Sequence, residues 1–255
     1  MNNHVELIEF KEPEQGQVYV SKINWPSSCD LLVQDLRQRF EPFGLIHCIK
    51  ASQGQDSFYA YINYYSSEAA QKAISFFLKQ ECTFQGQPCK IQRKTRDNVL
   101  KKGRPLYVNQ CEDLANFYLG FNGWSSKILY HNMESFEGQT VTFATAVQLT
   151  FSEFEGQIAE GVGLAKAEFS SPEEKSVQIA IAQKSSKSAA VMNAFSKVIL
   201  ALIHNDDGGH KVMVRIDPSR KDPFHYNSIW NSSETDVVQV QNLSHVDEDP
   251  DLFEK

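Results

Sequence analysis

The segment 55–64 contains three tyrosines, and over residues 58–62 tyrosines and apolar side chains alternate strictly. In a strand, this spacing puts Tyr59 and Tyr61 on one face of the sheet. The other face receives Phe58, Ala60 and Ile62, which can pack against a hydrophobic core. Two tyrosine rings on the opposite face favour a flat ligand that stacks on them, and for such a sheet the commonest flat ligand is an unstacked base.

The neighbouring segments predict a small α+β domain in the order strand, helix, strand, strand, helix, strand. A second alternating strand is expected at 18–23, with Val18 and Val20 on the face opposite Tyr19; unbroken alternation would place Lys22 with the valines. Apolar residues at helical spacing predict helices, with Ser27 or Ser28 as the cap of the first. The expected helices are 31–40 and 66–78, and the remaining expected strands are 45–49, 55–64 and 89–93.

The stretch 15–98 resembles an RNA-recognition motif. Its hexamer motif matches at 18–23, where Lys22 replaces the usual asparagine, and its octamer motif matches at 57–64. Ser57 replaces the basic first position of the octamer and Phe58 replaces its glycine, so one phosphate contact of the family is missing. The resemblance implies a four-stranded antiparallel sheet with two helices. Carried over by position, the stacking residues of the family fall on Tyr19, Tyr59 and Tyr61.

A covered sheet is the alternative reading, because many domains of this fold bind protein through the same face. The charge after the second helix favours nucleic acid, since residues 88–104 hold seven basic side chains against Asp97. Long basic side chains beside the tyrosine face could neutralise backbone phosphates, although such a run is often a solvated linker. With Lys22, the candidate basic contacts are Lys90, Arg93, Lys94, Arg96, Lys101, Lys102 and Arg104.

Length and charge predict two domains. The chain has 255 residues, with 41% hydrophobic and 22% charged residues, which is typical of a globular protein. The net charge is −7, but residues 1–104 hold 14 basic and 11 acidic residues, and the remainder hold 11 and 21. We therefore expect a motif at 15–98, a basic junction at 99–105, an α+β domain at 106–217 and an acidic tail at 218–255.

The second half predicts one β-rich sheet and one long covering helix. A short strand at 106–108 and a short helix at 114–119 are expected to precede a hairpin formed by 140–151 and 157–169. Gly161 and Gly163 indicate a bulge or bend in the return strand. The proline and acidic residues after Ser170 begin a helix that we expect to continue to about His204.

Residues 140–204 resemble the nucleic-acid-binding core of the Rad-fifty-two strand-annealing family. The likeness lies in the long hairpin, the segment 160–167 and the helical segment 189–197. The family's adjacent basic pair falls on Ser196 and Lys197, so Lys197 is the candidate binding residue. A scaffold for oligomerisation is the alternative role of this half.

Taken together, the two segments resemble a family that joins an RNA-recognition motif to a Rad-fifty-two-like half. That resemblance implies binding of single-stranded DNA, double-stranded DNA and RNA, with an accessory role in DNA recombination, repair and the DNA-damage response. It implies a protein of the nucleus and cytoplasm, and leaves a homo-oligomer open. A protein-interaction adaptor is the competing class, supported by the acidic residues and Leu252 and Phe253 in the tail.

Catalysis, metal binding and membrane insertion have little support in the sequence. The acidic pairs Glu153 with Glu155 and Asp206 with Asp207 lie in turn-like stretches typical of solvated carboxylates. Five cysteines and seven histidines show no zinc-like spacing, so no cofactor is expected and the cysteines are expected to be reduced intracellular thiols. The longest apolar run of the second half, 198–203, is too short to span a membrane, and the start of the chain lacks the form of a signal peptide.

Overall fold

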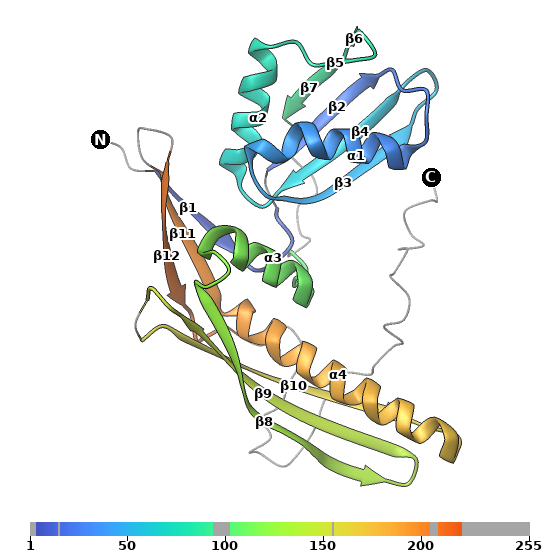
Figure 1. The fold of residues 1–255 in the computed structure, drawn as a ribbon, viewed down its shortest axis with the longest axis vertical. Coiled ribbons are helices and arrows are strands. Elements are labelled where there is room, and N and C mark those ends of the chain that lie inside the picture. The colour runs from blue at the N-terminus through green and yellow to red at the C-terminus, as the bar shows by residue number, and fades with distance from the viewer. Residues whose placement is uncertain (1–3, 15, 94–102, 155, 205–208, 221–255) are drawn as a thin grey trace. The chain divides into compact units, whose positions relative to one another are not determined.

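The computed structural model describes residues 4–14, 16–93, 103–154, 156–204 and 209–220 (Figure 1). The chain divides into two compact units. The first comprises Met1–Trp124 and Val198–Arg215, and the second comprises Ser125–Lys197 and Ile216–Lys255. Segments far apart in the sequence therefore belong to one unit; the expected limits of the domains stay a prediction.

A four-stranded antiparallel sheet with two helices on one face forms most of the first unit (Figure 1). The helices are α1 (Cys29–Phe40), extended by the short helix η1 (Glu41–Phe43), and α2 (Ser67–Lys79). The predicted order of strands and helices is confirmed, and a small hairpin between α2 and the last strand is an addition. The strands lie in the order β3 (Ile46–Gln53), β4 (Phe58–Tyr64), β2 (Gln17–Ile23), β7 (Lys90–Arg93), and the hairpin is β5 (Thr83–Phe84) with β6 (Gln87–Pro88).

Alternation along β2 and β4 puts their apolar side chains under the helices, as predicted. Val18, Val20 and Ile62 are fully buried there. The alternation stops at Lys22, whose φ of 58° accompanies a shift in register between Val20 and Ile23. Because this bulge adds one residue, Ile23 takes the inward position that unbroken alternation would give to Lys22.

A second sheet of the first unit joins the start of the chain to residues near 200. It has the order β1 (His4–Glu9), β11 (Val198–His204), β12 (His210–Ile216). The expectation of a helix to His204 is wrong, because the helix ends at Ser196 and the following run pairs antiparallel with β1. The strand expected at 106–108 is also wrong. Leu106 is buried, and Tyr107 caps the helix α3 (Val108–Leu119).

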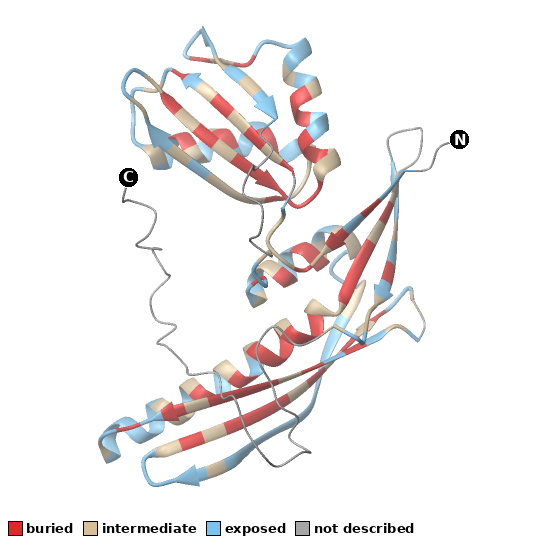
Figure 2. Cartoon of the chain, turned by 180° about the vertical axis from the view of Figure 1, so that it is seen from behind, coloured by how far each residue is buried: buried red, intermediate tan, exposed pale blue. Residues whose placement is uncertain are grey.

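The second unit is a three-stranded sheet with one long helix. The sheet has the order β10 (Ile158–Glu168), β9 (Thr140–Phe151), β8 (Trp124–Glu137), and α4 (Pro172–Ser196) packs on β9 and β10. Figure 2 shows the buried residues of α4 and these two strands. The hairpin of β9 and β10 was predicted, whereas β8 was not.

Two glycines let α4 lie directly on β10. The pairing of β9 with β10 runs without a shift from Ile158 to Glu168, so the bulge expected at Gly161 and Gly163 is absent from this described hairpin. A Cβ atom at Gly163 would overlap the carbonyl oxygen of Ser186, and one at Gly161 would overlap that of Ala190. The glycines are therefore explained by close backbone packing rather than by a bend.

Candidate nucleic-acid interface

Three tyrosines form one aromatic cluster on the sheet face opposite α1 and α2. Tyr19 of β2 and Tyr61 of β4 are direct cross-strand partners, with ring centroids 4.9 Å apart and an interplanar angle of 33°. The ring of Tyr59 lies 6.2 Å from that of Tyr19 and 6.0 Å from that of Tyr61. All three side chains are partly exposed, and Figure 2 shows this face of the sheet from the side away from the helices. We call Tyr19, Tyr59 and Tyr61 the tyrosine platform.

Two lysines share the face of the tyrosine platform. Lys50 of β3 is the register partner of Tyr61, and Lys90 of β7 is the partner of Ser21, next to Tyr19. Both lysines are exposed. Lys90 was a predicted contact, but Lys50 was missed. Its neighbours Ile49 and Ala51 pack on the core, so alternation along this strand could have identified Lys50 as outward-facing.

The other predicted basic residues of the sheet lie differently. Arg93 pairs with Val18, whose side chain points into the core, so the register places Arg93 on the side of the helices. Lys22 is exposed at the bulge of β2. Of the three predicted basic residues on the sheet, Lys90 is thus the one whose register position coincides with the platform face.

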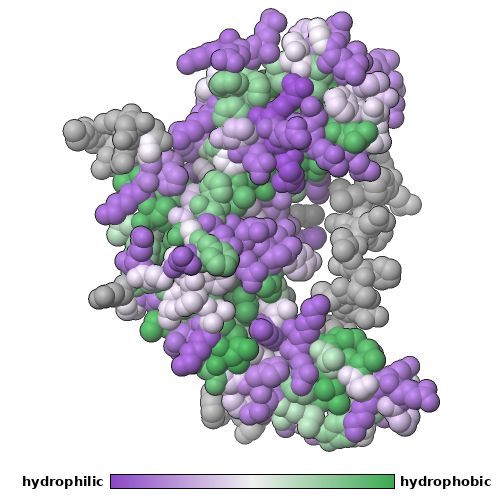
Figure 3. Space-filling model, in the orientation of Figure 1, coloured by the Kyte–Doolittle hydropathy of each residue, from purple (hydrophilic) through white to green (hydrophobic). Residues whose placement is uncertain are grey.

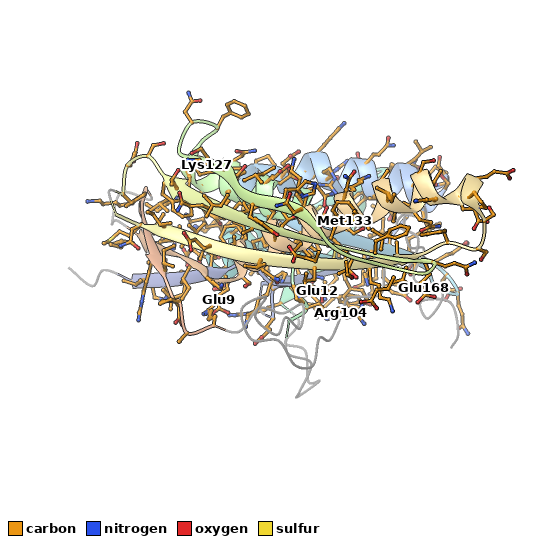
Figure 4. The ribbon with its side chains drawn as sticks, turned by 90° about the horizontal axis from the view of Figure 1, so that it is seen from below. Glu9, Glu12, Arg104, Lys127, Met133 and Glu168 are labelled. Atoms are coloured by element: carbon orange, nitrogen blue, oxygen red, sulfur yellow. The ribbon has the colours of Figure 1, made fainter. Side chains whose placement is uncertain are left out.

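Arg104 lies beside an acidic segment near the start of the chain. Its carbonyl oxygen accepts a hydrogen bond of 2.7 Å from the backbone N–H of Glu12, and Figure 4 shows the two residues together. Lys11 in the same segment pairs with Glu9 at 2.8 Å and with Glu14 at 2.9 Å. Four other predicted basic residues between the last strand and Arg104 lie outside the described residues: Lys94, Arg96, Lys101 and Lys102.

Lys197 in the second unit is held by the backbone of β10. It forms the C-cap of α4, and its Nζ donates a hydrogen bond of 2.7 Å to the carbonyl oxygen of Glu160. Lys166 lies on β10 six residues after Glu160, roughly 20 Å from it at the usual rise of a strand. Its Nζ pairs with Glu168 at 3.4 Å. The two lysines therefore do not form one groove within a single copy.

Comparison with known proteins gives the domain content of the chain. Residues 19–81 match the family described as RNA recognition motif, and residues 106–199 match the family described as RDM1 DSRM domain. The chain combines an RNA recognition motif with an RDM1 DSRM domain. The tyrosine platform is thus on the sheet of the RNA recognition motif, and the predicted resemblance to a family with this combination is confirmed.

Similar proteins cover most of the chain. It is 29% identical over 266 residues to RAD52 motif-containing protein 1 of Danio rerio, covering 96% of this chain and 91% of that protein. It is 29% identical over 259 residues to the protein of the same name from Gallus gallus, covering 93% and 89%. A solved structure described as Pes4 RRM3 matches 34% of this chain and 99% of that one, with 19% identity and a TM-score of 0.28. The matches to an RNA recognition motif and a DSRM domain support nucleic-acid binding as the general function of the chain.

Neither a metal site nor a membrane span is found in the described residues. No group of three histidine, cysteine or acidic side chains there is placed to hold a metal ion. Within the same residues, no helix has both the length and the apolar character needed to cross a membrane.

Proposed function

We propose that the RNA recognition motif binds single-stranded nucleic acid by stacking bases on the tyrosine platform. The observation that carries the proposal is the contact between the three rings on the face away from α1 and α2. Stacking of each base contributes about 1–3 kcal/mol to the binding free energy, and this contribution depends little on which base is stacked. Stacking therefore accounts for affinity, and it suits both DNA and RNA.

Lys50 and Lys90 supply positive charge beside the platform. The octamer motif has Ser57 in place of the family's basic residue, so Lys50, opposite Tyr61, can replace the missing charge on the same face. A lysine binds phosphate as a point charge without selecting a base. This arrangement favours recognition of the backbone and base faces over recognition of a particular sequence.

The cellular role that we propose is accessory and non-catalytic. We propose that the protein acts on single- and double-stranded DNA as well as RNA, in recombination, repair and the DNA-damage response; the similarity to proteins named for a RAD52 motif favours the recombination and repair part of this role. We propose the nucleus and cytoplasm as the compartments in which it acts. An RNA-binding or protein-interaction adaptor is the alternative.

The proposal is tested by replacing Tyr19 and Tyr61 together with alanine in the full chain. Affinity for single-stranded DNA and RNA should fall at least about tenfold, because two stacking contacts are lost. The variant with both residues changed to phenylalanine keeps the rings and should bind almost normally. Phe121→Ala, at an aromatic residue that is 84% exposed on a loop, is the matched control for removal of a surface ring. Unchanged affinity in a folded double-alanine variant would favour a protein-binding sheet.

The strand at the edge of the second unit supports a scaffold role for this half. All but two residues of β8 are exposed, and Figure 3 shows apolar side chains on the surface of this unit. An edge strand with exposed apolar residues is a template for pairing with another strand. We propose that a second copy of the chain pairs there, since identical edge strands can associate about a two-fold axis. The exposed apolar residues of β8 are Ile128, Leu129, Tyr130, Met133 and Phe136.

A further inference from the structure

Cys82 and Cys89 face each other across the hairpin that leads into β7. The pairs Thr83 with Pro88 and Phe84 with Gln87 define an antiparallel register, and its next step places Cys82 opposite Cys89. The backbone N–H of Cys89 donates a hydrogen bond of 2.9 Å to the carbonyl oxygen of Cys82, which continues the pairing. Directly opposed residues of antiparallel strands have Cα atoms about 4.5–5.5 Å apart, within the range of about 4.4–6.8 Å found for disulfides.

The two thiols interact, and a cation stands beside them. Because Cys82 and Cys89 occupy opposed positions of one antiparallel register, their side chains lie on the same side of the hairpin. The guanidinium of Arg39 lies over the ring of Phe84 at 4.6 Å and donates to the carbonyl oxygen of Thr83 at 3.0 Å. The hydrogen bond from Cys89, together with Arg39, lowers the pKa of Cys82 although burial opposes this; the same bond raises the pKa of Cys89. Positive charge near a thiol is typical of reactive cysteines.

The remaining cysteines have other surroundings. Cys48 accepts a hydrogen bond of 3.1 Å from the side-chain amide of Asn63, and Cys111 is buried in contact with the carbonyl oxygen of Leu106 at 3.6 Å. All five cysteines are reduced thiols in the structure. The pair at 82 and 89 is distinguished by opposed positions in one backbone register, with the guanidinium of Arg39 bound to the adjacent residue Thr83.

We propose that Cys82 and Cys89 are a peroxide-sensitive dithiol that closes to an intramolecular disulfide. The thiolate of Cys82 attacks one oxygen of hydrogen peroxide, the O–O bond breaks, and the departing hydroxide takes up a proton to leave as water. The sulfur of Cys89 then attacks the sulfenic acid, forms the S–S bond and displaces the hydroxyl group, which leaves as water with the proton of Cys89. The two sulfur atoms together lose two electrons, and the peroxide is reduced to two water molecules.

The disulfide would lie directly beside β7, the strand that carries Lys90. Residue 89 immediately precedes β7, whose register partner β2 carries Tyr19. The bridge crosslinks positions that are already opposed, so it restricts the unfolded chain without moving the tyrosine platform. We therefore expect oxidation to raise the melting temperature by about 5 °C and to leave affinity for single-stranded nucleic acid within about twofold, a change that corresponds to less than 0.5 kcal/mol.

The test is oxidation of the reduced full chain with one equivalent of hydrogen peroxide, followed by alkylation of the remaining thiols. Two of the five thiols should resist alkylation, and the mass should fall by two hydrogen atoms. Peptide mapping without reduction should link the peptides that contain Cys82 and Cys89, and dithiothreitol should restore both thiols. Cys29→Ser, which changes a partly exposed cysteine on α1, should still form the bridge.

Substitution at either member of the pair should abolish the linked peptides. Because Cys82 is buried and its replacement can impair folding, the partly exposed Cys89→Ser provides the second variant. In that variant peroxide should leave Cys82 as a trappable sulfenic acid. A bridge to another cysteine, sulfinic acid on one residue of the reduced wild type, or five alkylated thiols would each overturn the proposal. None of these results depends on whether the platform binds nucleic acid.

Discussion

The hydroxyl of Ser66 donates a hydrogen bond of 2.6 Å to Oε2 of Glu6, and both residues are buried. Ser66 is the N-cap of α2, and Glu6 lies on β1. The second oxygen of Glu6 accepts hydrogen bonds from the backbone N–H of Ser67 at 2.6 Å and from its hydroxyl at 2.7 Å. A carboxylate at this position satisfies the N–H groups at the helix start and interacts favourably with the helix dipole. The hydrogen bonds of Glu6 therefore connect the sheet that contains β1 to the start of α2 in the RNA recognition motif.

Glu6→Gln should destabilise the first unit by about 2 kcal/mol, because the neutral amide loses charge-assisted hydrogen bonds and one acceptor. Thermal or urea unfolding followed by circular dichroism measures the loss. Glu81→Gln, at an exposed glutamate after α2, is the control and should change little. Equal free energies of unfolding for the two variants would show that the hydrogen bonds of Glu6 do not stabilise the first unit.

Acid should weaken the same contact. Burial acts to raise the pKa of Glu6, but hydrogen bonds from Ser66, Ser67 and the backbone of Glu68 outweigh it and lower the pKa below its usual 4.5. A carboxylate with a lowered folded pKa stabilises the fold fully above the unfolded value and progressively loses this contribution as pH falls through the folded value. The stability of the wild type should therefore fall below about pH 4.5 more steeply than that of Glu6→Gln. Parallel pH profiles of unfolding in the two proteins would contradict this.

Gly163→Ala should destabilise the second unit by about 1–3 kcal/mol, because the new methyl group would overlap the backbone of α4 at Ser186 and Ala190. Backbone atoms of a packed helix cannot move aside as a flexible side chain can. Lys166→Ala, on the opposite face of β10, is the control. Urea unfolding measures the free energy of unfolding of both variants. An unchanged free energy for Gly163→Ala would mean that α4 can shift without loss of stability.

The sequence predicted the sheet of the RNA recognition motif well because its strands are half buried and alternate over short distances. Val18, Tyr19 and Val20 each lie on the expected face. Lys22 departs from the alternation because the bulge in β2 takes a positive φ at this residue, and a lysine gives no local signal for that conformation. The outward position of Lys50 was available from the same alternation, but the strand was expected to end at Ile49, one residue earlier.

The strand β11 could not be predicted from local pattern. A short apolar run after a helix is consistent with either continued helix or a buried strand. The run forms a strand because it pairs with β1, where Val5 pairs with Ile203 and Leu7 with Ala201. This pairing joins residues almost 200 positions apart, so no window around Val198 contains it. The candidate binding residues in 94–102 lie outside the described residues, and their role stays a prediction.

Changing Lys50 and Lys90 together to glutamine should weaken the salt dependence of single-strand binding. Each phosphate contact contributes about 0.7 to the slope of log affinity against log salt for a single strand, so the slope should fall by about 1.4. Lys79→Gln, in the last turn of α2 on the other side of the sheet, is the control. Titrations with matched single-stranded DNA, single-stranded RNA and duplex measure the slope and the preference. An unchanged slope would exclude these lysines as phosphate contacts.

The basic residues from Lys94 to Arg104 should add a larger, sequence-independent contribution to the salt dependence of binding. Changing Lys94, Arg96, Lys101, Lys102 and Arg104 to glutamine should lower the slope by about 3.5 if each contacts a phosphate of a single strand. Relative affinities for different sequences should stay the same, because phosphate contacts carry no base information. The same salt titration, made with two unrelated sequences, checks both expectations. A slope equal to that of the wild type would make the junction a solvated linker.

Leu129→Lys with Met133→Lys should prevent the association that we propose through β8. These side chains are 47% and 50% exposed on the edge strand, so the substitutions should leave the fold of one copy intact. Charged side chains on an edge oppose pairing with another strand by requiring their desolvation. Light scattering should therefore give the mass of a dimer or larger assembly for the wild type and of one chain for the variant. Val177→Lys, at an apolar residue of α4 that is 57% exposed, controls for a change in surface charge. A wild type that is monomeric at high concentration, or a variant that still associates, would refute the role of β8.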